Sequence, residues 1–263
     1  MYSLHKADLP SIENLCSYNI VRLDLLNYNY FPDYFNLVKL CLSVCPRLKF
    51  LALDITEEEQ LNWLKSTGLE YLHINVLRRA EKLNVDNLLE KFGSNLQCLK
   101  IKNCILSISK LAVSCPKLDH LEIKYRTFSD NPDDSEQIFR HLRCFAVCYI
   151  NDNNSSTCEA LRLLLLCAPL LQSIFFVECV LSPEIKLYIL KCCENLNLNM
   201  IAFHQTQVDV NFLIDVLSSC STSTILDLRE WDFNTYDNIM ALINFAYTLP
   251  NKPRVLIDGD GPS

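Results

Sequence analysis

The chain has 263 residues, of which 50% are hydrophobic and 21% are charged, and this balance excludes a disordered or low-complexity polymer. The formal net charge is -7 at pH 7, which disfavours nucleic acid as a partner because a phosphate backbone would be repelled. With only four glycines, the chain contains neither GxGxxG nor GxxxxGK, the common phosphate-binding loops. We therefore expect one or two folded units without a nucleotide-binding loop of these kinds.

The first ten residues lack the apolar stretch of a secretory signal, and no run of about 18 apolar residues occurs in the chain. The 14 cysteines are spread over a chain long enough to fold without disulfides, so reduced thiols are expected. These features predict a location in the cytoplasm, the nucleus or both, without contact to a membrane.

A repeated pattern, L-x-x-L-x-L, organises the sequence from its N-terminal part onward. Five consecutive copies begin at Leu48, Leu69, Leu96, Leu118 and Leu142. Weaker copies of the pattern begin at Ile20, Leu171 and Leu198. A partial copy follows with Leu226 and Leu228, and a candidate for the last strand is Val255-Leu256-Ile257. The mean spacing is about 25 residues, which lies within the range of leucine-rich repeats.

Alternation within each copy predicts a strand whose leucines point to one side of a parallel sheet. Segments with helical spacing lie between the copies, at residues 35–42, 61–64, 88–92, 161–165, 185–190 and 212–217. Strand, helix and parallel strand make a right-handed crossover, and about nine of these would stack into a curved array. The predicted fold class is thus α/β, a right-handed β-α superhelix with the sheet on the concave face and helices on the convex face.

We divide the chain into a lead-in or cap at 1–17, a repeat array at 18–230, and a C-terminal part at 231–263. The C-terminal part would hold the last helix, the candidate last strand and a cap.

Two segments carry a family resemblance. Cys45-Pro-Arg-Leu48 and Cys115-Pro-Lys-Leu118, each continuing into its leucine pattern, resemble the C-P-x-L-x-x-L-x-L phrase of cysteine-containing repeats in F-box/LRR proteins. Cys104 and Cys179 stand three residues after the last strand leucine, where that subtype has a cysteine. The resemblance implies the substrate-recognition part of an SCF ubiquitin ligase, with the ligase adaptor and cullin as partners wherever an F-box is present. No F-box is recognisable, since Leu9-Pro-Ser-Ile-Glu13 matches only its start.

The leading interpretation is a protein-interaction module that belongs to such a receptor. The alternative is an F-box-free scaffold or inhibitor that occludes a partner protein. The predicted inner wall covers about 700 Å², close to the ~800 Å² that each partner contributes to a standard interface.

An enzyme is not expected, because no GxSxG, HExxH or paired-carboxylate motif surrounds the five histidines. No CxxC pair occurs, so we expect no metal site, and no cofactor is predicted.

Side chains between the leucines are free to serve binding, because the core does not need them. Stacking the copies places three lysines together, with two aromatic residues beside them, in an otherwise acidic protein. The candidate partner-binding residues are Phe50, Tyr71, His73, Lys100, Lys102, His120, Glu122, Lys124 and Phe175. Two interpretations remain open: a binding hot spot for an acidic partner, or an ordinary solvated face on which Glu122 neutralises a lysine.

Two polar loops follow neighbouring copies, the acidic segment 129–136 and the segment 151–156. Repeats that stack in register would bring both loops to one rim of the array. One hypothesis makes Asp130, Asp133 and Asp134 an acidic lip that contacts a partner. The other makes both segments merely long connections.

Overall fold

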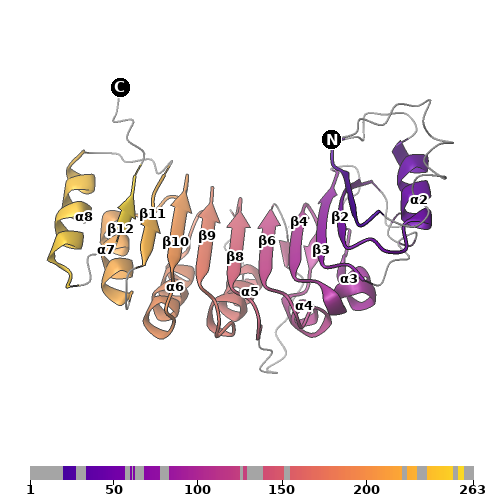
Figure 1. Cartoon of the computed structure of the whole chain (residues 1–263). Coiled ribbons are helices and arrows are strands. Elements are labelled where there is room, and N and C mark those ends of the chain that lie inside the picture. The colour runs from indigo at the N-terminus through magenta and orange to yellow at the C-terminus, as the bar shows by residue number, and fades with distance from the viewer. Residues whose placement is uncertain are drawn as a thin grey trace.

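The computed structural model describes residues 20–27, 34–56, 60, 62, 68–77, 83–124, 127–128, 139–150, 155–220, 224–229, 236–250 and 254–257. Ten parallel strands form one sheet whose order follows the chain, and Figure 1 shows them as a single curved row. They are β1 (Arg22–Leu25), β2 (Phe50–Ile55), β3 (Tyr71–Val76), β4 (Cys98–Lys102), β6 (His120–Lys124), β8 (Cys144–Cys148), β9 (Ser173–Val177), β10 (Met200–His204), β11 (Ile225–Asp227) and β12 (Arg254–Leu256).

The leucine pattern sets the register of this sheet. Leu23 aligns with Leu51, and the same position continues through every strand to Val255 of β12. The inward side chains are buried in one continuous cluster that runs along the whole array. The predicted α/β leucine-rich-repeat solenoid is therefore confirmed, since one strand cannot bury its apolar side without the next.

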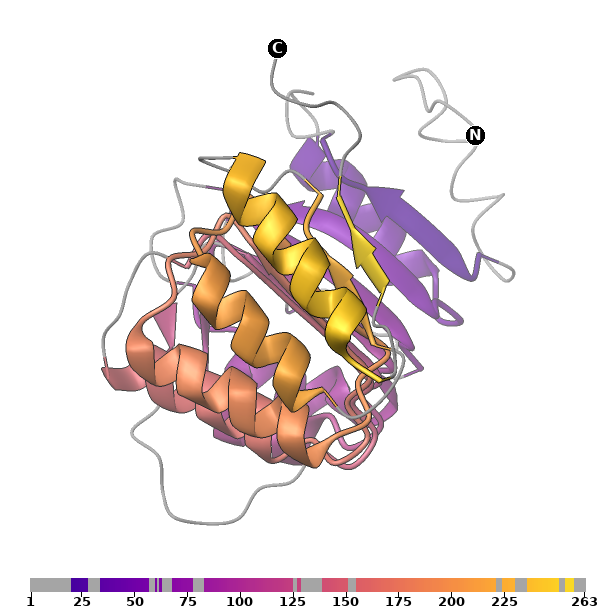
Figure 2. The same cartoon turned by 90° about the vertical axis from the view of Figure 1, so that its left-hand side faces the viewer.

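Helices return the chain between strands and cover one side of the sheet. Figure 2, viewed along the row, shows the helices as one layer and the strands as another. The helices are α2 (Tyr34–Val44), α3 (Asp86–Phe92), α4 (Ile108–Ser114), α5 (Ser155–Leu166), α6 (Pro183–Asn195), α7 (Val210–Ser219) and α8 (Tyr236–Thr248). Five of the predicted helical segments fall in these helices. Of the sixth, at 61–64, only residue 62 is described.

The first leucine of each copy precedes its strand rather than lying within it. We expected strands from Leu118 and Leu142, but β6 begins at His120 and β8 at Cys144. The N–H groups of Asp119 and His120 both donate to the carbonyl of Gln97, each at 2.9 Å. Two successive amides that share one carbonyl mark a bend, so the regular ladder starts after it. Both leucines are nevertheless buried.

A second bend follows the strands. Within the described residues, the non-glycine residues with positive φ all follow a repeat strand, and they are Asn27, Asn103, Tyr149, Glu178 and Gln205. Each stands two residues after the last inward side chain of its strand, and the next residue turns back toward the core. That next residue is buried in four of these repeats, at Cys104, Ile150, Cys179 and Thr206. The cysteine position of the resemblance is thus a core position directly after a left-handed turn.

Buried thiols and hydroxyls at this position bond to backbone carbonyls. Cys179 Sγ lies 3.5 Å from the carbonyl of Val147 in β8, one strand back, and Thr206 Oγ1 donates to the carbonyl of Phe176 in β9 at 3.1 Å. None of the 13 cysteines in the described residues forms a disulfide, and nine of them are buried. Burial raises the pKa of the Cys115 thiol to about 12, which keeps it neutral, as suits a small hydrophobic core residue.

Helices α3 and α4 approach closely where the short helix η3 (Gly93–Asn95) follows α3. A Cβ atom on Gly93 would lie 2.6 Å from Cys115 Sγ and 2.6 Å from the carbonyl oxygen of Ser114. Only glycine fits this contact without a shift of the neighbouring repeat.

The connection from β6 to β8 differs from the helical connections we expected after each strand. In its described part, residues 127–128 and 139–143, there is no helix. Residues 127–128 form strand β7 (Thr127–Phe128), which pairs with β5 (Ile105–Leu106) in a separate two-stranded sheet. The lead-in at 1–17 lies outside the described residues, and the boundary at 230 stays a prediction.

Candidate partner-binding surface

On the concave face, side chains that point away from the leucine core form three rows, and each row runs across the strands, as the leucine spacing predicts. The middle row consists of Asp24, Ala52, His73, Lys100, Glu122, Ala146, Phe175, Ala202, Asp227 and Leu256. The rows on either side place Phe50 next to Tyr71, and Lys102 next to Lys124. The predicted candidates from Phe50 to Lys124 therefore lie on four adjacent strands, β2 to β6.

An aromatic stack occupies the N-terminal part of this face. The rings of Phe50 and Tyr71 lie 4.0 Å apart between centroids, with 11° between their planes. The guanidinium carbon of Arg22 lies 3.7 Å from the Phe50 centroid, in a cation–π arrangement. Sequence reasoning did not select Arg22, although it stands in the same row as both rings.

Glu122 joins two of the three lysines. Its carboxylate oxygens lie 2.6 Å from Lys100 Nζ and 3.0 Å from Lys124 Nζ. Burial opposes ionisation of Glu122, but hydrogen bonds from both lysines outweigh it and lower the pKa of this carboxyl. Glu122 thus forms the ion pairs that the interpretation as an ordinary solvated face expects, and the choice between the two interpretations stays a prediction. One carboxylate shared by two ammonium groups still leaves an excess of positive charge.

These groups surround an open depression of about 220 Å³. Its lining consists of Leu26, Asn27, His73, Asn75, Lys100, Ile101, Lys102, Glu122 and Lys124. Sequence reasoning did not select Asn27 or Asn75, although Asn75 stands next to Lys102 in the same row of the sheet. The buried Asp54 carboxylate accepts from the backbone N–H of Asn27 at 2.7 Å and from Asn75 Nδ2 at 2.6 Å.

His73 and His120 are half-buried rather than fully solvated. Burial is the main reason that the pKa of His73 and that of His120 lie below the ordinary 6.5. The positive charge of Lys100 acts in the same direction on both. These imidazoles are therefore uncharged at neutral pH, and positive charge on this part of the face comes from Arg22 and the lysines.

Phe175 lies apart from the other predicted residues. Its strand, β9, is separated from the lysines of β6 by β8, and the adjacent middle-row residues are Ala146 and Ala202. The structure thus divides the predicted set into a charged and aromatic group on β2 to β6 and a single phenylalanine on β9.

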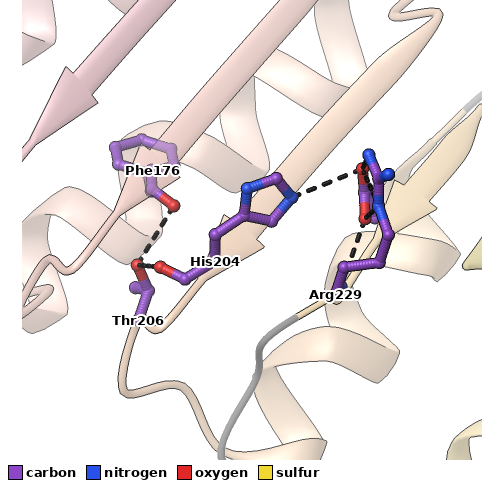
Figure 3. A network of polar contacts seen from close by, with 5 residues as sticks. Phe176, His204, Thr206 and Arg229 are labelled. Atoms are coloured by element: carbon purple, nitrogen blue, oxygen red, sulfur yellow. Dashed lines mark hydrogen bonds and ion pairs between the residues drawn. The ribbon is translucent and has the colours of Figure 1, made fainter. Parts of the chain in front are cut away.

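In the C-terminal part of the face, the carboxylate of Asp227 is buried. Arg229 bonds to it through Nε at 3.0 Å and Nη2 at 2.6 Å, and His204 Nε2 lies 3.3 Å from Oδ2. Figure 3 shows His204 and Arg229 pointing toward the same group, and Thr206 turned back to Phe176. The hydrogen bonds from Arg229 lower the pKa of Asp227 even though its burial acts in the opposite direction.

Asp130, Asp133 and Asp134, the predicted acidic lip, lie outside the described residues. Over the described part of the chain, no three His, Cys, Asp or Glu side chains gather in a way that could hold a metal ion. In the same residues, no helix is both long and apolar enough to cross a membrane.

Comparison with known proteins gives little further information. No family model matches the chain, and no curated protein matches it either. Among solved structures, the chain is similar to an internalin from Listeria monocytogenes, with 12% identity, over 96% of this chain and 89% of the internalin. The TM-score is 0.38, too low to carry an argument, so the fold assignment rests on the strand register described above.

Proposed function

We propose that this protein is a protein-interaction module that recognises its partner with the concave face of β1 to β6. The observation that carries the proposal is the aromatic stack of Phe50 and Tyr71 beside the lysine depression. Neither group is needed to fill the core, which the inward leucines already form. Aromatic and cationic side chains grouped on an open face are the types that dominate interface energy.

The charge of the site supports an acidic partner. The protein as a whole has a net charge of -7, whereas the lining of the depression has three lysines and one glutamate. A local field of opposite sign to that of the whole molecule would orient an approaching acidic surface.

The test compares two double variants of the full chain. Phe50→Ala/Tyr71→Ala removes the aromatic stack, and Val113→Ala/Leu187→Ala removes apolar side chains from the exposed surface of α4 and α6 as a matched control. Quantitative affinity purification from the source cells should lose its specific partner with the first variant and retain it with the second. Equal recovery by both variants would reject the concave face as the binding surface.

The finer assignment follows the resemblance to F-box/LRR proteins, in which this array would be the substrate-recognition part of a ubiquitin-ligase receptor. The Cys45-Pro and Cys115-Pro phrases support it, and the buried Cys104 and Cys179 fit the cysteine position of that subtype. Recovery of the ligase adaptor and cullin in the same purification supports this assignment, in the cytoplasm or the nucleus. A stable partner without them favours the F-box-free scaffold or inhibitor.

A further inference from the structure

We infer that the depression between β3, β4 and β6 binds a carboxylate group presented by the partner polypeptide. This inference rests on the proposed function and goes further, because it assigns a ligand chemistry to one site on the face. The carboxylate group can come from two sources in a partner polypeptide, an acidic side chain or the C-terminus.

The charge of the site favours an anion. Among the lining residues, three lysines stand against one glutamate, with His73 uncharged at neutral pH. The buried Asp54 carboxylate, bonded to Asn27 and Asn75, adds one negative charge behind this lining. The positive charge is also confined, since the lysines come from β4 and β6 only. A single negative group in this depression therefore contacts more positive than negative charge.

The lysines retain donors for a ligand. An ammonium group has three N–H donors, and Lys100 and Lys124 each direct one ion pair to Glu122. The side chains of Lys100 and Lys124 are 30% and 38% exposed, so their remaining donors are within reach of a bound group. The ion pairs with Glu122 keep both ammonium groups beside the depression.

The size of the site limits what can enter. About 220 Å³ is less than the 300–1,000 Å³ of ordinary small-molecule pockets, and it suits one side chain or one chain end. A carboxylate and a phosphate dianion both meet the attraction of the lysines and the repulsion of Glu122, so the phosphate probe described below is needed to separate them.

The wall of the depression is held in place before any ligand arrives. Asp54 fixes both Asn27 and Asn75, and it is itself fixed because its backbone N–H donates to the Tyr34 hydroxyl at 3.0 Å. The Tyr34 hydroxyl donates to the carbonyl of Asp54 at 2.9 Å, and the carbonyl of Leu25 lies 3.2 Å from the same oxygen. The loop after β1 is thus tied to β2 and β3 at the border of the lysine site.

The experiment titrates short peptides into the full chain, with lysine labelled with 13C at Cε and followed by NMR. The first probe, acetyl-Gly-Ser-Gly-Glu-Gly-Ser-amide, has one side-chain carboxylate. The second has glutamine in place of glutamate and a free C-terminus, and the third is the same glutamine peptide with an amidated C-terminus. Inorganic phosphate is the fourth probe.

We expect the first or second probe to shift the resonances of Lys100, Lys102 and Lys124, and the neutral third probe to leave them unchanged. Binding of the first alone identifies an acidic side chain as the source, and binding of the second alone identifies a chain end. The inference is overturned if no carboxylate probe shifts these lysines, if the neutral peptide shifts them equally, or if phosphate binds more tightly than both.

Lysine variants distinguish binding at this depression from electrostatic attraction to the protein surface as a whole. Lys102→Gln/Lys124→Gln should weaken carboxylate binding by about tenfold or more, as expected for lost charge-assisted bonds. Lys117→Gln/Lys191→Gln removes the same charge from exposed positions elsewhere and should change affinity by less than about twofold. An equal loss in both variants would mean that only net charge matters, and would overturn the inference.

Glu122→Gln provides a second measurement, in which the expected result is a gain in affinity rather than a loss. Removing the internal counter-charge should strengthen carboxylate binding by severalfold, while a purely structural role would give weaker or unchanged binding. Failure of the peptide experiments leaves the purification test of Phe50 and Tyr71 intact, so the inference and the proposed function are refuted by different results.

Discussion

The two halves of the concave face use charge in opposite ways. On β4 and β6 the ion pairs are accessible to solvent, with Glu122 19% and Lys100 30% exposed. On β11 the Asp227 carboxylate is fully buried, and its main partner Arg229 covers it from the surface. Glu122 and Asp227 occupy the same row of the sheet. Exposure, rather than residue type or position in the repeat, therefore separates a group available to a ligand from one that stabilises the fold.

Removing each carboxylate tests this difference most strongly. Asp227→Ala should lower the free energy of unfolding by about 2 kcal/mol, because His204 and Arg229 lose a buried partner, although Arg229 can regain water. Glu122→Gln should cost less than about 1 kcal/mol, since both lysines are open to solvent. Urea unfolding followed by circular dichroism measures both values. Equal costs would contradict the division into a stabilising and a binding half.

A substitution at Gly93 shows whether the halves are stable independently. Gly93→Ala should cost about 1–3 kcal/mol, because the new Cβ would overlap Ser114 and Cys115 of the next repeat. Repeats contact mainly their neighbours, so hydrogen exchange should accelerate in α3 and α4 and change little in α6 and α7. Uniform acceleration along the chain would instead indicate one cooperative unit.

Lowering the pH should reduce the free energy of unfolding in two separate pH ranges, one for each half of the concave face. Well above pH 6.5, His73 and His120 are neutral in both the folded and the unfolded chain, so they add no pH dependence there. Below 6.5 the unfolded chain takes up protons that the folded chain resists, because burial lowers both folded pKa values, and the free energy of unfolding falls.

His73→Gln/His120→Gln should flatten this decline, and His141→Gln, at an exposed turn, should not. For Asp227 the folded pKa is lowered, so its contribution is present above the ordinary value of 3.8 and is lost as the pH falls through the folded pKa. Unfolding measured from pH 7 to 3 resolves the two ranges. An unchanged profile in the double variant would contradict the assignment to these histidines.

The smallest expected effect concerns the left-handed turns at the strand ends. Glu178 has a φ of 52°, a region that costs a residue with a Cβ roughly 1 kcal/mol, so Glu178→Gly should stabilise the chain by up to about 1 kcal/mol. Glu178→Ala keeps the Cβ and should give no gain. Thermal unfolding compares the two variants, and a gain with alanine would assign the effect to the lost charge.

Part of the candidate site could be predicted from single positions in the repeat. Because side chains alternate along a strand, the spacing alone places Lys100, Glu122 and Lys124 on adjacent strands. Phe50 and Tyr71 were paired for the same reason, and their rings stack. Arg22 could have been found by extending that row by one strand.

Other parts of the site depend on contacts that no repeat position indicates. Asn27 follows β1 and lines the depression because the buried Asp54 carboxylate holds its backbone N–H, whereas Asn75 stands in the same row as Lys102. In the same way, nothing in the spacing distinguishes the fully buried Asp227 from the partly exposed Glu122. Burial at each site depends on neighbouring side chains, which come from distant segments of the chain.

The sequence by itself determined the architecture, the strand order and the register, because a leucine pattern repeated every two dozen or so residues buries its apolar side only by stacking on its neighbours. The tertiary structure alone decided which outward charges are compensated, which are accessible, and where the face is hollow. These properties follow from distances of a few ångströms between side chains of different repeats, and a pattern of residue types does not contain those distances.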